Sequence, residues 1–455
     1  MSETEIIERE SGLKQALTRA QIVMIGLGGA IGTGLFMGSG IAIGYAGPAV
    51  LISYAIAAAI AVAMVLSLSE MAVMHPAAGS FGVYAETYLS PWIGFLVRYT
   101  YWAAQVIAVG GEAVAAGTYM TFWIPGVPVW IWSLAFAVIL LFVNSRSVKN
   151  FGTFEYWFAF IKVTAIVGFI LLGGAAVLGI GQPAIGTHNL TGLPGGFMPH
   201  GFKGVWMGVI MAIFSFVGIE LIAVTSAETP DPTKAIPAAL RSMAVRLALF
   251  YLLALTILLS FTPWTQSGAR VVAESPFVRV FAHMGVPYAA GIMNFVVLSA
   301  ALSAMNTNIY LATRMLFSLS RGGYAPKFLG RLNPAGAPIG AILVSGAGVV
   351  ASAALSFFTP LAYNYLFGVS LFGAIFVWMV ILACHLRFRR RHPAERLPVR
   401  TPFFPVPQLL GLAALSAILV TMGLDTDFWN VSWIVGVPWL AALSAVYFMG
   451  LRRRA

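Results

Sequence analysis

About twelve apolar stretches of roughly 20 residues follow one another along this chain of 455 residues, and they limit most strongly what it can fold into. A helix of that length crosses about 30 Å of hydrocarbon. Because 60% of the residues are hydrophobic and only 9% are charged, the composition excludes a soluble globular domain. The sequence predicts an all-α membrane protein. The expected spans are 20–44, 47–70, 92–122, 126–144, 154–180, 203–227, 243–263, 280–310, 338–357, 362–386, 405–423 and 432–451.

The distribution of Lys and Arg predicts the orientation of the chain. With a cytoplasmic amino terminus, the inner segments hold 21 of the 26 basic residues, the outer loops hold three, and the other two, Arg98 and Lys162, fall within spans. Because cytoplasmic loops of membrane proteins carry an excess of Lys and Arg, we expect both termini in the cytoplasm and a multi-pass protein of the inner membrane. The net charge of +11 is then a topology signal facing anionic lipid, and we expect no nucleic-acid partner.

The first apolar stretch contains eight glycines between Gly26 and Gly44. Glycine destabilises a helix by about 1 kcal/mol relative to alanine, and lipid cannot satisfy the freed backbone groups. Irregular backbone at membrane depth persists where it lines a cavity, so the pattern indicates a helix broken to hold a ligand. Close packing of helices through small residues explains the same glycines, and both interpretations stay open at this point.

A second interruption lies at the corresponding place in the second half, where Ser215, Gly218 and Glu220 interrupt an apolar segment. Paired interruptions of this kind indicate a binding site at the membrane midplane of an inverted repeat. Amides freed beyond the first break suit a carboxylate, and carbonyls freed near Ile213, Phe214 and Ser215 suit an ammonium group. An α-amino acid carries both charges about 3 Å apart. The two breaks together therefore predict an amino acid site.

Several motifs carry a family resemblance: Leu27 to Gly40, Ser69 to Ala72, Ala78 to Phe81, Phe154 to Trp157 with Lys162, Phe214 to Glu220, Ala227 to Pro232, and Ser303 to Asn306 with Thr313 to Leu316. In this order they resemble the bacterial amino acid transporter, or amino acid permease, family of the amino acid-polyamine-organocation superfamily. The resemblance implies a leucine-transporter-type fold of two inverted five-helix repeats, with helices 1 and 6 broken and two further helices. It also implies proton-coupled uptake of an amino acid.

On this basis the chain divides into six segments. They are a cytoplasmic segment 1–19, the first repeat 20–180, an outer loop 181–202, the second repeat 203–386, a basic cytoplasmic loop 387–404, and the last two helices with the tail at 405–455.

The resemblance also implies which residues bind the substrate. Those expected to hold its carboxylate are Ala30, Gly32, Thr33 and Gly34. Phe214 and Ser215, with Val217 close by, are expected near its amine and side chain, and the position of the second break adds Ile213 and Ile219. The apolar members of the second set favour a neutral substrate.

Lys162 is the most informative charge, because it falls deep within the fifth expected span. A buried ammonium group is expensive in a membrane and is functional by default. By resemblance, Lys162 occupies the place of a sodium ion, near the first break and near Ser303 and Asn306. Its proton state is then expected to bias the protein toward inward or outward opening, which makes Lys162 a candidate for proton coupling. A lysine that only anchors the helix at the interface is the alternative.

Two carboxylates within the spans, Glu112 and Glu220, are the further candidates for proton coupling. The histidines are scattered without ligand spacing, and no phosphate-binding loop occurs, so we expect no metal, no cofactor and no enzymatic activity. The energy source is then an ion gradient or exchange. We expect proton symport of a neutral amino acid, with an exchanger or uptake of a cationic amino acid as alternatives.

Overall fold

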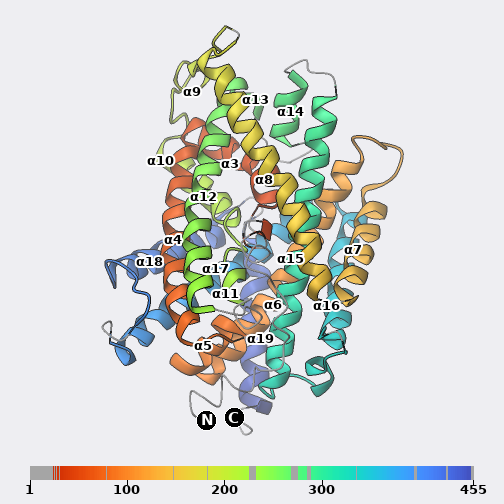
Figure 1. Ribbon diagram of the computed structural model, residues 1–455, viewed down its shortest axis with the longest axis vertical. Helices are drawn as coiled ribbons and strands as arrows, with labels where there is room; N and C mark the ends of the chain where they lie inside the picture. The colour runs from red at the N-terminus through yellow and green to blue at the C-terminus, as the bar shows by residue number, and fades with distance from the viewer. Residues whose placement is uncertain are drawn as a thin grey trace.

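Helices form every regular element in the described part of the chain (Figure 1). The computed structural model describes residues 24, 26, 28, 29, 31–77, 79–146, 148–181, 183–224, 232–267, 275–283, 288–334, 336–393, 397–426 and 429–451. The long helices are α4 (Val50–Met74), α6 (Pro91–Met120), α7 (Val129–Arg146), α8 (Val148–Leu178), α10 (Gly201–Phe214), α12 (Pro232–Phe261), α15 (Ala289–Arg321), α16 (Ile339–Phe358), α17 (Ala362–Arg391), α18 (Val406–Leu424) and α19 (Val431–Val446). The short ones include η1 (Gly34–Gly38), α3 (Ser39–Ala46), α5 (Ser80–Tyr88), α9 (His188–Thr191), α11 (Leu221–Val224), α13 (Trp264–Ser267), α14 (Pro276–His283) and η6 (Tyr447–Leu451).

Seven helical stretches among the described residues are long and apolar enough to cross a membrane. They are Gly34–Met74, Gly152–Leu178, Ala289–Arg321, Ile339–Phe358, Ala362–Arg391, Val406–Leu424 and Val431–Gly450. Three shorter apolar helices, at Val129–Ser145, Gly201–Phe214 and Arg246–Phe261, accompany them. The all-α membrane protein is confirmed, and the count of twelve spans stays a prediction.

Several helices extend beyond the stretches expected from hydropathy. α8 begins at Val148 rather than 154, and α12 begins at Pro232 rather than 243. The expected span 280–310 is wrong, because α14 ends at His283 and α15 runs from Ala289 to Arg321. Hydropathy marks the part of a helix that lies in lipid, whereas the backbone hydrogen bonds continue into the polar ends.

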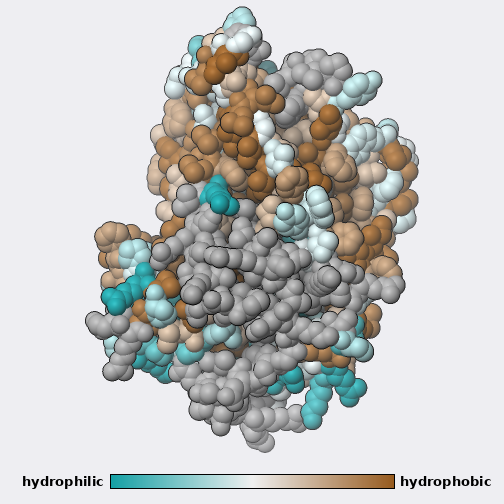
Figure 2. Space-filling model, in the orientation of Figure 1, coloured by the Kyte–Doolittle hydropathy of each residue, from teal (hydrophilic) through white to brown (hydrophobic). Residues whose placement is uncertain are grey.

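The surface shows which faces meet lipid. On α8, Leu171 and Leu172 are 66% and 69% exposed, while Glu155 and Lys162 on the same helix are fully buried. Hydrophobic residues cover most of the described upper half of the face in Figure 2, and hydrophilic residues gather toward its lower edge. The exposed apolar face of α8 therefore meets lipid, and its charged side chains point into the protein.

Helix α6 lies at the centre of the molecule and contacts α15 and α17. Ser90 caps its start, since the Ser90 hydroxyl accepts a hydrogen bond from Ile93 N at 3.2 Å, and Pro91 follows at the first helical position. From this fixed start, α6 runs past the middle of the bundle with Gln105, Ala108 and Glu112 on one side. These three residues form one wall of the cavity described below.

Candidate functional site

The first glycine-rich segment is interrupted in the structure. Gly28 and Gly29 are helical, Ile31 and Gly32 form a bend, and the backbone then continues as the wide helix η1. The side chain of Thr33, the residue preceding η1, does not cap that helix. The first amides of a helix lack partners within that helix, and the Thr33 side chain does not supply one here.

The second interruption begins where α10 ends at Phe214. Residues 215–220 form turns, and helix resumes at Leu221. Gly218 has a φ of +104°, a conformation that side-chain-bearing residues rarely adopt, so the turn requires glycine there. Tyrosine hydroxyls support the turn: Tyr251 donates to Ser215 O at 2.6 Å, and Tyr54 shares a hydrogen bond of 3.0 Å with the Ser215 hydroxyl.

The two interruptions contact each other. A Cβ atom placed on Gly34 would lie 2.9 Å from Ser215 Cα and 3.1 Å from Phe214 Cδ1. On the other side, a Cβ atom on Gly32 would lie 3.0 Å from both Ala304 Cβ and a Glu112 oxygen. The structure therefore confirms close packing at these glycines, and the binding of a ligand by the broken helix stays a prediction.

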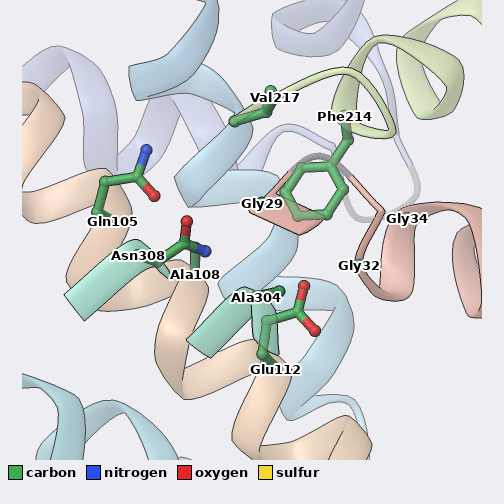
Figure 3. Close-up of a pocket in the computed structure, with 10 residues that line it drawn as sticks. All are labelled: Gly29, Gly32, Gly34, Gln105, Ala108, Glu112, Phe214, Val217, Ala304 and Asn308. Carbon is green, nitrogen blue, oxygen red and sulfur yellow. The ribbon is translucent and has the colours of Figure 1, made fainter. Parts of the chain in front are cut away.

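A small cavity lies between the two breaks and the central helices (Figure 3). Its wall consists of Gly29, Gly32, Gly34, Gln105, Ala108, Glu112, Phe214, Val217, Ala304 and Asn308. The Phe214 ring stands over the glycines, and the Glu112 carboxylate points toward them from α6. The cavity volume is about 20 Å³, room for about one water molecule. A larger occupant requires the two breaks to move apart.

Glu112 is the charged group of the cavity. One of its carboxylate oxygens accepts a hydrogen bond from Thr33 N at 3.4 Å, so an amide freed by the first break already meets a carboxylate. The other oxygen is buried without a hydrogen-bond partner among the described residues. A buried polar atom in this state is costly and is commonly satisfied by a ligand or a proton.

Lys162 lies near the middle of α8, 14 residues after Val148 and 16 before Leu178. The fully buried ammonium group donates to Gly28 O and, at 2.7 Å, to Ile31 O. These carbonyls belong to the first break, where helical partners are lost. Lys162 therefore ties α8 to the broken segment, and its amino group points into the protein and not to the membrane interface.

Glu155 is a functional candidate that the sequence analysis missed as a site residue. It is fully buried on α8, accepts from the Ser303 hydroxyl, and accepts from Asn306 Nδ2 at 3.2 Å. Ser303 and Asn306, which were predicted to lie near Lys162, therefore contact the Glu155 carboxylate. Glu155 lies two helical turns before Lys162 on the same face of α8.

We expect Glu155→Ala to lower the melting temperature by about 5 °C, because it leaves the buried Ser303 hydroxyl and Asn306 amide without their acceptor, at roughly 1–3 kcal/mol each. The double variant Glu155→Ala with Lys162→Met carries no unpaired charge, so it should recover part of that loss. Glu155→Gln keeps hydrogen-bonding atoms without the charge and separates the two contributions. Thermal unfolding in detergent measures all three. A double variant no more stable than Glu155→Ala would contradict an electrostatic link between Glu155 and Lys162.

Glu220 lies at the second break but away from the cavity wall. Its carboxylate accepts from Tyr101 OH at 2.7 Å, from Gly218 N at 3.1 Å and from Trp378 Nε1 at 3.4 Å. Three donors from α6, the turn and α17 hold the charge in place. In this arrangement Glu220 fastens the turn to the neighbouring helices.

The remaining predicted residues divide by position. Phe214 and Val217 line the cavity, whereas Ile213 and Ile219 are fully buried beside it. The carbonyls of Ile213 and Phe214 accept hydrogen bonds from Phe216 N at 2.9 Å and from Val217 N at 3.0 Å. The expectation that these carbonyls are unpaired is therefore wrong. Each carbonyl oxygen retains a second lone pair for a ligand. Ala30 lies outside the described residues.

Comparison with known proteins agrees with this arrangement. The family model for amino acid permeases matches residues 21–455. The chain belongs to the amino acid permease family. It is 38% identical over 448 residues to the uncharacterized amino acid permease YtnA of Bacillus subtilis, covering 97% of this chain and 96% of that protein.

Two other relatives carry substrate names. The gamma-aminobutyric acid permease of Bacillus subtilis is 36% identical over 455 residues, covering 98% of this chain and 95% of the relative. The aromatic amino acid transport protein AroP of Escherichia coli is 38% identical over 440 residues, covering 96% and 95%. This permease is therefore a multi-pass membrane protein of amino acid transport and not an enzyme.

Proposed function

We propose that this permease is a secondary active transporter that imports an α-amino acid with a neutral side chain together with a proton. The supporting observation is the hydrogen bond from Thr33 N to Glu112 in the cavity between the breaks. In this contact the amide freed at the first break has a carboxylate as its partner. The substrate carboxylate would take the same place, beside Gly32 and Gly34.

The other end of the site suits the rest of an amino acid. The second lone pairs of the Ile213 and Phe214 carbonyls face an ammonium group in this proposal. Phe214, Val217 and Ala304 offer apolar contacts, which favour an aliphatic or aromatic side chain. The names of two relatives support this choice, since gamma-aminobutyric acid and the aromatic amino acids have no net charge at neutral pH.

The proposed architecture is the one the resemblance implies. Twelve spans would form two inverted repeats, 20–180 and 203–386, followed by the basic loop 387–404 and the last two helices, with both termini in the cytoplasm. Two broken segments in contact support it. In this arrangement Lys162 replaces a sodium ion, and its two carbonyl contacts hold the first break in position.

Glu112 supplies the proposed coupling step. While charged, Glu112 occupies the Thr33 amide and repels a second carboxylate. When Glu112 takes up a proton, it becomes a weaker acceptor and releases the amide to the substrate. Binding of the proton and binding of the substrate therefore favour each other, which is the linkage that symport requires.

A thermal-shift panel of the purified permease against the common amino acids tests the substrate class, because a ligand stabilises the folded state in proportion to its occupancy. Uptake into empty proteoliposomes under an imposed pH gradient then separates the symporter from the exchanger. Accumulation in empty vesicles supports symport. Uptake only into vesicles preloaded with amino acid would establish exchange, and stabilisation by cationic amino acids alone would overturn the neutral substrate.

We expect Glu112→Gln to remove the pH dependence of substrate binding. In the parent protein, affinity should fall about tenfold from low to high pH, once Glu112 has lost its proton and reclaimed the amide. The amide side chain of the variant cannot titrate, so its affinity should be the same at both pH values. Binding of a radiolabelled amino acid to the detergent-solubilised protein measures this.

The matched control is the same substitution at Glu220, whose oxygens are held by three donors outside the cavity wall. Glu220→Gln should lower stability and keep the pH dependence. If Glu220→Gln removes the pH dependence and Glu112→Gln retains it, the coupling role belongs to Glu220.

A further inference from the structure

A row of three aromatic rings, Phe214, Phe367 and Trp429, leads from the cavity to the connection between α18 and α19. The Phe214 and Phe367 ring centroids lie 4.0 Å apart, and those of Phe367 and Trp429 lie 5.9 Å apart with the rings inclined at 66°. We call these residues the aromatic row. Phe214 lines the cavity, so the aromatic row closes the cavity on the side of Phe214.

Helix α17 carries the middle ring and touches both breaks. Tyr363 OH donates to the Thr33 hydroxyl at 3.3 Å, and the Tyr363 ring lies 5.8 Å from that of Phe367. One turn further along, Phe367 packs on Phe214 at the second break. The first turns of α17 thus contact both broken segments on one side of the cavity. The contact with the second break depends on the position of the Phe367 ring.

Trp429, in the connection between α18 and α19, is held in place by burial and by hydrogen bonds. Its indole is fully buried, its amide donates to Asp425 Oδ2 at 3.3 Å, and its carbonyl accepts from the Ser432 hydroxyl at 2.6 Å. Trp433, one turn further along the same segment, is 39% exposed and donates to Leu419 O at 2.8 Å. Two tryptophans of one helical hairpin therefore have different environments, and Trp429 is the one directed at the site.

We propose that Trp429 is a positioning residue for the gate of the substrate site, holding Phe367 against Phe214 so that the cavity closes on the side of the α18–α19 connection. This inference rests on the proposed function. It gives the last two helices, which lie outside the proposed repeats, a part in opening and closing the site. Removal of the Trp429 indole lets the Phe367 ring retreat, which shifts the population toward a site open on that side.

Cysteine labelling tests the gate without any substrate. The chain has a single cysteine, the buried Cys384, so Cys384→Ser provides a background without thiols. Ala108→Cys then places one thiol in the cavity wall. Membrane vesicles of both orientations are treated with a membrane-impermeant thiol reagent, and the labelling rate is followed in the Ala108→Cys protein with and without Trp429→Ala.

We expect Trp429→Ala to raise the labelling rate about tenfold from the side of the α18–α19 connection, in line with the loss of one aromatic contact, and not from the other side. Trp433→Ala is the matched control and should leave the rate unchanged. Trp429→Phe retains a ring and should restore most of the closure. If Trp429→Ala folds poorly, Phe367→Leu removes the middle ring and should give the same one-sided increase.

Equal labelling rates in the parent and the Trp429→Ala protein, or an equal increase with Trp433→Ala, would overturn the gate. Amino acid counterflow by the parent protein is measured separately. A permease that shows the one-sided increase but no counterflow would retain the gate and lose the proposed function, so the two failures are distinguishable.

Discussion

Lys162→Ala is expected to abolish proton-driven accumulation while leaving measurable substrate binding. An inward gradient of one pH unit corresponds to about 1.4 kcal/mol, or roughly tenfold accumulation at one proton per substrate. The parent permease should approach that ratio in proteoliposomes, and the variant should stay near equilibrium. The physical reason is that the Lys162 ammonium fastens the Gly28 and Ile31 carbonyls of the first break, so its loss frees that segment from α8.

A second lysine provides the control for this experiment. Lys203 is exposed at the start of α10, so Lys203→Ala removes the same charge without touching the breaks. It should accumulate substrate like the parent protein. Full accumulation by Lys162→Ala under the same pH gradient would discard the role of Lys162 as a replacement for sodium.

Gly34→Val is expected to weaken substrate binding by roughly 100-fold. A Cβ atom at this position would lie 2.9 Å from Ser215 Cα, which is backbone and cannot rotate away. Overpacking of this kind costs about 3 kcal/mol and would push the two breaks apart or block the amides at the start of η1. Binding of a radiolabelled amino acid to purified protein measures the change.

The same substitution at Gly168 separates binding from helix propensity. Gly168 lies on α8, where an added Cβ meets nothing within 4 Å. Gly168→Val should therefore bind substrate with parental affinity. Unchanged affinity in Gly34→Val would place the substrate carboxylate elsewhere in the protein.

The two breaks could be predicted because their signals are local. Glycines between Gly26 and Gly44, and a serine, a glycine and a glutamate in residues 215–220, contradict a continuous lipid-exposed helix whatever the surroundings are. The structure interrupts the helices at both places. The burial of Lys162 follows from the same kind of argument, since a charge at that depth has to face the protein interior.

Glu155 was missed as a site residue because of a helix boundary. The expected span began at 154, which placed Glu155 one residue from the end of that span. The structure begins α8 at Val148 and so places Glu155 seven residues inside the helix. Its spacing of seven residues from Lys162 was a usable signal, because residues two turns apart share one helix face.

The contacts of α17 and of Trp429 depend on tertiary packing, and the hydropathy and motif patterns of the sequence do not predict them. Thr33 and Tyr363 are 330 residues apart in the sequence, and Trp429 reads as an aromatic residue of the membrane interface. Nothing in either local sequence indicates that α17 lies over both breaks. The hydrogen bond from Thr33 N to Glu112 likewise depends on the position of α6 against the first break.

The central claim is that both charges of an amino acid are bound by backbone groups where the two breaks meet. Competition binding tests it most directly, with the best amino acid of the thermal-shift panel as radioligand. The competitors are its analogue without the carboxylate and its analogue without the amino group. The account predicts that each analogue competes at least about 100-fold more weakly than the amino acid, since a buried donor or acceptor is left unpaired. Equal competition by the analogue without the carboxylate would contradict it.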